Sequence, residues 1–233
     1  MVNGVLLVNK PQGPTSHDVV EVVRRKLGTR RIGHAGTLDP MARGLLLLLI
    51  GPATKQQHHF QGHDKVYDAV LQLGTQTDTG DATGAVVQTA PVPALERHRV
   101  AEVLASFEGA LSQTPPSYSA VKVRGRPAYW WARRQQPVAL ASRTVQIAAL
   151  SLVELAPPRL AFRVSCSSGT YVRTLAEAIA QRLGCVGHLT SLVRLSVGHW
   201  SVDQASSLEW IAQASPEAVA HRVQSLDTSE MTA

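Results

Sequence analysis

Cysteine is scarce in this chain. Its 233 residues include only Cys166 and Cys185, and their spacing forms neither a CxxC pair nor a zinc-ligand pattern. A scaffold held together by disulfides is therefore not expected. We interpret the two cysteines as small buried apolar residues of a protein in a reducing compartment, while a disulfide between them stays open as an alternative.

Long apolar segments are also missing. The longest strongly apolar run, Leu45 to Ile50, has six residues, whereas a membrane-spanning helix needs about 20. The N-terminus shows no signal-peptide pattern. We therefore expect a cytoplasmic protein that does not enter a membrane.

Common motifs of catalytic and metal sites are absent as well. The sequence contains no Walker loop, no GxSxG elbow and no zinc deaminase signature. His58, His59 and His63, next to Asp64, match no usual ligand spacing and are interpreted as the surface of a helix. No metal and no cofactor are therefore expected.

Aromatic residues make up only 5% of the chain, but positive charge is plentiful. Lys and Arg outnumber Asp and Glu by 23 to 17, which gives a net charge of +6 and a pI near 9.7. This balance favours a polyanionic partner through phosphate neutralisation. The segment from Pro115 to Pro137 combines basic and aromatic residues, a mixture suited to gripping RNA. Its aromatic residues are Tyr118, Tyr129, Trp130 and Trp131. At least one of Tyr129, Trp130 and Trp131 is expected to anchor a short helix to the sheet instead.

Short strands and helices alternate along the chain without a repeated unit. Thr15 to Leu27 predicts a helix, with Thr15 and Asp18 at capping-box spacing and Gly28 as terminator. The run Leu45 to Ile50 predicts a buried strand. Strands outnumber helices in no regular βαβ order, so we predict a mixed α+β sheet domain. Further strands are expected at 4–9, 67–73, 85–89, 144–154, 160–166 and 192–200, and further helices at 94–111, 171–183 and 208–222.

One carboxylate, Asp39, lies within RRIGHAGTLDPMARG at residues 30–44. Gly33 and Gly36 permit backbone conformations closed to other residues, and Pro40 biases Asp39 toward an extended conformation. A turn would then hold the carboxylate beside basic residues, which suits chemistry on a phosphate-bearing substrate. Asp before Pro is equally an ordinary helix start, with Asp as N-cap. The local sequence leaves both interpretations open.

The same segment resembles the active-site motif of the TruB family of bacterial tRNA pseudouridine synthases. Four further blocks match that family in order: GVLLVNKPQGPTSHD at 4–18, DKVYDAVLQLGTQTDTGDATG at 64–84, QTPPSYSAVKVRGRPAY at 113–129 and SSGTYVRTLAEAIAQRLGCVGHLTSLVRLSVG at 167–198. The resemblance implies the pseudouridine synthase fold, a bent mixed sheet flanked by helices with a central active-site cleft. It also implies an isomerase that converts the uridine at position 55 in the T loop of tRNA to pseudouridine, with an RNA-clasping insertion at about 115–137.

The family's functional residues match this sequence position by position. Asp39 matches the nucleophile, which attacks the flipped nucleotide at the sugar or the base, and Arg173 matches its ionic partner. Tyr67 matches the tyrosine that stacks on the target base, and His34 the residue that fills the vacated space. Without the resemblance, Arg173 would be a solvated arginine, Tyr67 a residue of the core or of a strand edge, and His34 a surface histidine. The remaining matches are Tyr171 and Leu192 in the substrate pocket and Lys10 in a supporting role.

Some features depart from the family pattern. Leu47 stands where the family commonly has Pro, and Val193 where it has a basic residue. Residues 1–202 are expected to form the catalytic domain, and 203–233 a C-terminal helix and polar tail in place of the small β domain of many relatives. We therefore expect a stand-alone monomeric enzyme that acts on the T arm of tRNA. The alternative is a non-catalytic tRNA-binding or folding chaperone, although binding alone would not require Asp39, Tyr67 and Arg173 together.

Overall fold

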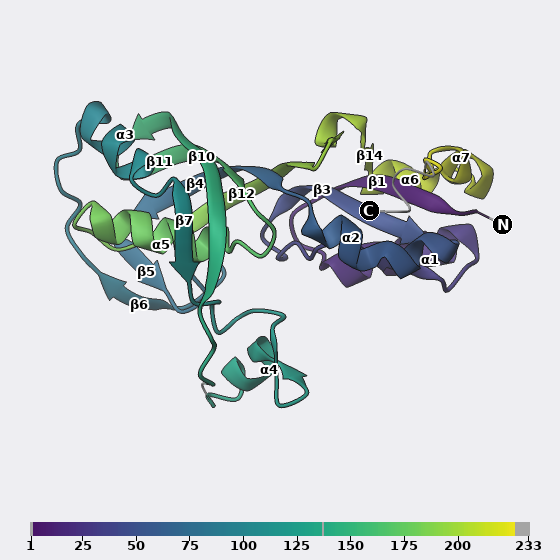
Figure 1. Ribbon diagram of the computed structural model, residues 1–233, viewed down its shortest axis with the longest axis horizontal. Helices are drawn as coiled ribbons and strands as arrows, with labels where there is room; N and C mark the ends of the chain where they lie inside the picture. The colour runs from purple at the N-terminus through teal and green to yellow at the C-terminus, as the bar shows by residue number, and fades with distance from the viewer. Residues whose placement is uncertain (1, 137, 227–233) are drawn as a thin grey trace. The chain divides into compact units, whose positions relative to one another are not determined.

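The computed structural model describes residues 2–136 and 138–226, which divide into two compact units (Figure 1). Unit 1 contains the described residues up to Tyr67 and those from Val193 onward, and unit 2 contains the residues from Asp68 to Leu192. Two strands, β4 (Lys65–Leu73) and β12 (Gly187–Val197), have residues in both units. The division at residue 202 that the sequence suggests stays a prediction.

Unit 1 is built on a sheet with the strand order β14, β1, β3, β12. β1 runs antiparallel to β3 along its whole length, from Gly4 opposite Ile50 to Lys10 opposite Gly44. The end of β3 that begins at Arg43 pairs with β12 in parallel, and β2 pairs with the other end of β3. The elements of this unit are β1 (Gly4–Lys10), α1 (Ser16–Leu27), β2 (Ile32–His34), β3 (Arg43–Ile50), η1 (Gly51–Gln56), α2 (Gln57–Gly62), β13 (Trp200–Ser201), η2 (Val202–Gln204), β14 (Ser206–Ser207), α6 (Leu208–Gln213) and α7 (Pro216–His221).

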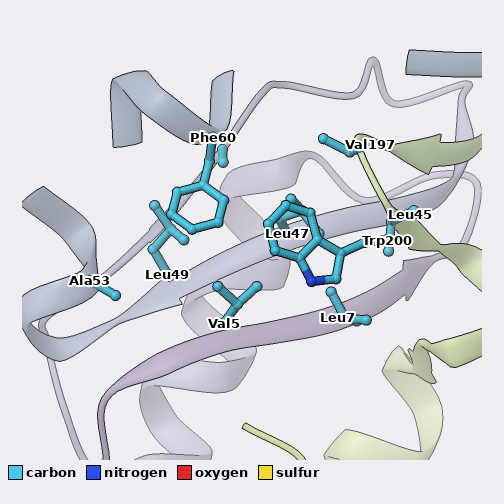
Figure 2. Close-up of a cluster of buried hydrophobic side chains, with 10 residues drawn as sticks. Val5, Leu7, Leu45, Leu47, Leu49, Ala53, Phe60, Val197 and Trp200 are labelled. Atoms are coloured by element: carbon cyan, nitrogen blue, oxygen red, sulfur yellow. The ribbon is translucent and has the colours of Figure 1, made fainter. Parts of the chain in front are cut away.

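The apolar run of β3 is buried on both faces, as predicted. Leu45, Leu47 and Leu49 join a cluster with Phe60 of α2 and Trp200 of β13, as Figure 2 shows. The alternate residues of the strand point to the opposite face and are also fully buried. A strand covered on both sides has no solvent-facing positions, which explains an uninterrupted apolar sequence.

The helix predicted at 15–27 is confirmed as α1, together with both of its ends. The backbone N–H of Asp18 donates to the Thr15 hydroxyl, and the Asp18 carboxylate accepts from the Thr15 backbone N–H at 2.8 Å, which completes the capping box. At the C-terminal end, Gly28 adopts a left-handed conformation with φ of 61°. The helix buries Val19, Val20 and Val23.

The helix expected at 208–222 is instead two short helices, α6 and α7. Ser215 caps α7 by accepting from the backbone N–H of Ala218, and Pro216 occupies its first turn. Because Pro lacks an N–H and favours the start of a helix, it separates the two segments. The chain then returns to β1, where Val5 and Gln224 exchange backbone hydrogen bonds of 2.9 Å. The end of the expected polar tail, residues 227–233, lies outside the described residues.

Unit 2 contains the strand order β4, β11, β10, β7. The long strand β10 is antiparallel to both of its neighbours, and α5 packs its apolar face, including Leu175 and Ile179, into the core. The small hairpin β8–β9 and α4 lie beyond the ends of β7 and β10 (Figure 1). The elements that lie wholly in this unit are β5 (Thr75–Thr77), β6 (Val86–Thr89), α3 (Arg97–Ala105), β7 (Gly109–Gln113), β8 (Lys122–Val123), β9 (Arg126–Pro127), α4 (Ala128–Ala132), β10 (Arg143–Ala156), β11 (Arg159–Cys166) and α5 (Val172–Arg182).

The helix predicted at 94–111 is too long, because its last residues form strand β7. α3 ends before Ser106, and Gly109 turns the chain with φ of 96°. Residues 109–113 then pair with β10, where Gln113 lies opposite Arg143. Strand pairing in the folded protein thus overrides local helix preference here. The strand expected at 192–200 likewise begins earlier, as β12, and is interrupted at Gly198, where φ is 55°.

The structure also describes the state of the two cysteines, the length of the helices and the grouping of possible metal ligands. Cys166 and Cys185 are both buried and form no disulfide, so the disulfide alternative is wrong. Across residues 2–136 and 138–226, no helix is long and apolar enough to cross a membrane. The same residues contain no group of three or more His, Cys, Asp or Glu side chains that could hold a metal ion.

Candidate active site

Asp39 lies in the irregular loop that joins β2 to β3 in unit 1. The backbone turns at Pro40 and Met41, where the N–H of Ala42 donates to the carbonyl of Asp39 at 3.0 Å. No helix begins here, so the turn interpretation of the Asp-Pro pair is confirmed and the helix-cap interpretation is wrong. Of the two glycines expected to shape the loop, Gly36 has a positive φ, 98°, whereas Gly33 lies in β2 without one.

The loop is held through its backbone by side chains from β1 and α1. The Ser16 hydroxyl donates to the carbonyl of Leu38 at 3.1 Å and accepts from the Leu38 N–H at 2.9 Å. On the other side of Asp39, the carbonyl of Pro40 accepts from the Gly13 N–H at 2.8 Å and from the Lys10 ammonium at 3.4 Å. Both peptide neighbours of the half-buried Asp39 are therefore fixed.

Lys10, the expected supporting residue, is fully buried. Its ammonium also donates to the carbonyls of Pro11 and Pro14, at 3.0 and 2.8 Å. Burial lowers the pKa of Lys10 to about 8; the charge of Asp39 opposes this shift and the guanidinium of Arg194 adds to it. The partners of Lys10 are backbone carbonyls, so its structural task is to shape the loop.

His34 lies at the end of β2, shortly before Asp39. Burial lowers the pKa of His34 below its ordinary value, and the nearby charges of Arg194 and His17 lower it further. Its Nδ1 atom is buried and has no hydrogen-bond partner among the residues that the structure describes. His34 is therefore a neutral imidazole at physiological pH, and it is not the surface histidine that local sequence would suggest.

Tyr67 occupies an inward-facing position of β4. The strand alternates regularly between buried and half-buried residues, and Tyr67 is only 8% exposed. The ring therefore lies on the covered side of the strand. Tyr67 is also the residue at which the first segment of unit 1 ends.

Arg173 lies in the first turn of α5 in unit 2 and is 4% exposed. Its two terminal nitrogens donate to the backbone carbonyls of Thr79 and Tyr118, at 2.6 and 2.8 Å. Its Nε lies 3.9 Å from a carboxylate oxygen of Asp81. The interpretation of Arg173 as a solvated helix arginine is wrong, since a guanidinium with these bonds is buried and fixed in direction.

Asp81, in the loop after β5, is a neighbour of Arg173 that the sequence motifs did not single out. It is 4% exposed, and its Oδ1 accepts from the Thr79 hydroxyl and the Thr83 N–H, both at 2.9 Å. Glu177, one turn after Arg173 on α5, has its pKa raised by burial, while a hydrogen bond from Gln76 and the charge of Arg173 act in the opposite direction. Two acidic side chains, Asp81 and Glu177, thus lie near the arginine within unit 2.

Tyr171 and Leu192, the expected pocket residues, also belong to unit 2. The side-chain amide of Gln113 forms two hydrogen bonds with the backbone of Tyr171: it accepts from the N–H at 3.1 Å and donates to the carbonyl at 3.4 Å. The guanidinium carbon of Arg143 lies 4.8 Å from the centre of the Tyr171 ring. Leu192 is an apolar residue of β12 with 6% exposure.

In the aromatic and basic segment at 115–136, one aromatic side chain anchors α4 and another is exposed to solvent. The indole N–H of Trp131 donates to the carbonyl of Val123 at 3.1 Å, which ties α4 to the β8–β9 hairpin. Tyr129 is 41% exposed, and the guanidinium of Arg134 lies 3.6 Å from the centre of the Trp130 ring. One ring is thus an anchor, as expected, and the described residues still present stacked cation–aromatic pairs. Pro137, the expected end of the segment, lies outside the described residues.

The predicted site residues divide between the two units. Unit 1 joins Lys10 to the Asp39 loop and holds His34 and Tyr67, while unit 2 joins Arg173 to the 77–84 loop and holds Tyr171 and Leu192. The first group offers a carboxylate on a braced loop. The second offers a directed guanidinium. A carboxylate can act as a nucleophile, and a guanidinium can stabilise negative charge.

Comparison with solved structures establishes the fold. The chain is similar to a protein in the crystal structure of a Cbf5–Nop10–Gar1 complex, with a TM-score of 0.73 and 26% sequence identity. The match covers 95% of this chain and 60% of that protein. The α+β architecture predicted from the sequence is thereby confirmed.

Comparison of sequences identifies the family. Residues 24–172 match the model of the TruB family pseudouridylate synthase N-terminal domain. The tRNA pseudouridine synthase B of Opitutus terrae is 46% identical over 90% of this chain and 87% of that protein. That of Aromatoleum aromaticum is 47% identical over 89% of this chain and 67% of that protein. The chain belongs to the TruB family of pseudouridylate synthases, which are isomerases, and the predicted pseudouridine synthase fold is confirmed.

Proposed function

We propose that this protein converts the uridine at position 55 in the T loop of tRNA to pseudouridine. The observation that carries this proposal is the identity of close to one half with proteins named tRNA pseudouridine synthase B, over about nine tenths of the chain. The net charge of +6 and the exposed aromatic and basic residues at 115–136 support a polyanionic substrate. We further propose that the enzyme recognises the T arm, acts as a monomer and works in the cytoplasm without a metal or a cofactor.

The reaction rearranges bonds within one nucleotide. The bond between the sugar C1′ and N1 of uracil breaks, the base turns, and a new bond forms between C1′ and C5. The C5 hydrogen leaves as a proton and N1 gains one, so no oxidant, reductant or group donor is needed. A nucleophile that holds one fragment while the base turns is sufficient.

We assign that role to Asp39. Its neighbours in sequence, Leu38 and Pro40, are each fixed by side-chain hydrogen bonds, so the carboxylate can be presented without a search over loop conformations. The roles of the remaining residues follow from the resemblance and are supported by their local geometry. Arg173 would stabilise the ionised carboxylate, Tyr67 would stack on the target base, and His34 would replace that base in the T loop as a neutral ring. Tyr171, Leu192 and Lys10 would line or brace the site.

The test is tritium release from a tRNA transcript that carries tritium at C5 of its uridines. Wild-type protein should release one equivalent per tRNA, and none from a transcript with cytidine at position 55. Asp39→Asn should lower the rate by at least about a thousand-fold, because an amide of the same shape is not a nucleophile. Asp68→Asn is the matched control, since Asp68 pairs with Arg163 on the surface, and it should retain the wild-type rate.

The outcomes separate catalysis from binding. Release that survives Asp39→Asn, in protein prepared from a host lacking its own enzyme, would overturn the assignment of the nucleophile. Tight tRNA binding without release by the wild-type protein would favour the chaperone alternative. Comparing release from an isolated T-arm hairpin with release from whole tRNA tests whether the T arm alone is the recognised element.

A further inference from the structure

Arg194 is a buried charge with no role in the reaction as described so far. It lies in the part of β12 that belongs to unit 1, and it is the largest of the side chains that are less than 2% exposed. Placing a guanidinium in the interior costs several kcal/mol unless its donors are satisfied. The contacts of Arg194 therefore indicate why the charge is buried.

The guanidinium of Arg194 grips the two ends of the Asp39 loop. Its Nε donates to the carbonyl of Leu45 at 2.7 Å, where the loop has entered β3. One of its terminal nitrogens donates to the carbonyl of Gly36 at 3.1 Å, where the loop has just left β2. One planar group thus holds together backbone positions on either side of Asp39, and its fork geometry fixes their separation.

The backbone of Arg194 approaches the same loop closely. Arg194 is the parallel partner of Gly44, and a Cβ atom at Gly44 would lie 2.2 Å from the Arg194 carbonyl oxygen. Gly44 also has a φ of 101°, which other residues rarely adopt. Because Gly44 has no side chain, β12 can pair closely with β3 at this point, and this pairing places the Arg194 guanidinium next to the loop.

We propose that Arg194 is a positioning residue for the nucleophile, which closes the Asp39 loop by bridging the Gly36 and Leu45 carbonyls. The proposal rests on the function assigned to Asp39 above. Arg194 holds the backbone at the two ends of the loop, whereas Ser16 and Lys10 hold the backbone of the residues next to Asp39. Its loss should therefore displace the carboxylate and leave RNA binding intact. A displacement of about 1 Å can lower a rate by about a hundred-fold.

Single-turnover kinetics of Arg194→Gln and Arg194→Lys test the proposal. The glutamine variant should lose about a hundred-fold in the rate of tritium release at saturating tRNA, with the tRNA concentration for half-saturation unchanged within about three-fold. Lysine keeps the charge and can reach only one carbonyl at a time, so it should recover about ten-fold of that loss. Arg163→Gln, which removes an exposed arginine of β11, should behave as wild type.

Amide hydrogen exchange gives a second readout that does not depend on activity. In Arg194→Gln, exchange should accelerate in peptides covering 35–42, with β1 and α1 unchanged. The proposal is overturned if the glutamine variant keeps the wild-type rate and loop protection. It is also overturned if lysine fails to recover activity, or if protection falls equally throughout unit 1. If wild-type protein releases no tritium, the proposed function fails, and the exchange experiment still decides whether Arg194 holds the loop.

Discussion

Asp39 and Arg173 are held in opposite ways. Asp39 lies on an irregular loop, and its position is set by hydrogen bonds to the carbonyls of neighbouring residues, from Lys10, Ser16 and Arg194. Arg173 lies on a regular helix, and its own side chain makes the hydrogen bonds, to the carbonyls of Thr79 and Tyr118. The residue that carries the carboxylate is thus held through the backbone of its neighbours, whereas the Arg173 guanidinium itself donates to backbone carbonyls.

This difference follows from the chemistry of the two groups. A guanidinium has five N–H donors, so it can be anchored by some while others remain available. Hydrogen bonds to the carbonyls of Leu38 and Pro40 fix the residue that carries the carboxylate, whichever group the carboxylate itself contacts. The contrast predicts which substitutions are tolerated in each region.

The largest effect is expected from Arg173→Lys. An ammonium cannot bridge the Thr79 and Tyr118 carbonyls in the same directions, so we expect tritium release to fall about a thousand-fold, which is about 4 kcal/mol. Arg182→Lys, at the exposed end of the same helix, is the control and should change the rate by less than two-fold. A wild-type rate in Arg173→Lys would mean that only positive charge is required, and the proposed directional role would be lost.

A smaller effect is expected from Gly44→Ala, which changes β3 next to the Asp39 loop. The new methyl group would lie 2.2 Å from a backbone oxygen of Arg194 at a φ of 101°, so we expect a loss of about 3 kcal/mol in unfolding free energy, measured by urea denaturation. Gly33→Ala is the matched control, since nothing lies within 4 Å of its added Cβ atom. Equal stability of the two variants would contradict the close packing of β3 against β12.

The smallest effect is expected from the titration of Lys10. Its folded-state pKa of about 8 lies below the ordinary value of 10.5, so the unfolded chain binds more protons between these two pH values. Stability must then rise with pH across that window. We expect the unfolding free energy of wild type, relative to Lys10→Met, to increase by about 2 kcal/mol between pH 7 and pH 9.5. A difference that is flat or falls with pH would show that Lys10 is not a buried ammonium.

Local sequence patterns predicted the elements whose causes are local. The capping box at Thr15 and Asp18, the Gly28 terminator and the buried strand at 45–50 are all present. Of the two helices that were predicted too long, one failed for a reason that lies elsewhere in the chain and the other at a local break. Residues 109–113 are recruited as a strand by β10. The segment after α6 breaks at Ser215 and Pro216 and then returns to β1 through Gln224.

The amino-acid sequence by itself determined the family, the apolar core strand and the identity of the candidate residues, because these depend on residue type and order. Only the tertiary structure decided that Asp39 lies on a turn and not at a helix start, since that turn is held by Lys10, Ser16 and Arg194 from distant parts of the chain. It also decided that Arg173 and Arg194 are buried. Burial of a charge depends on long-range packing and on backbone partners, which neighbouring letters in a sequence do not encode.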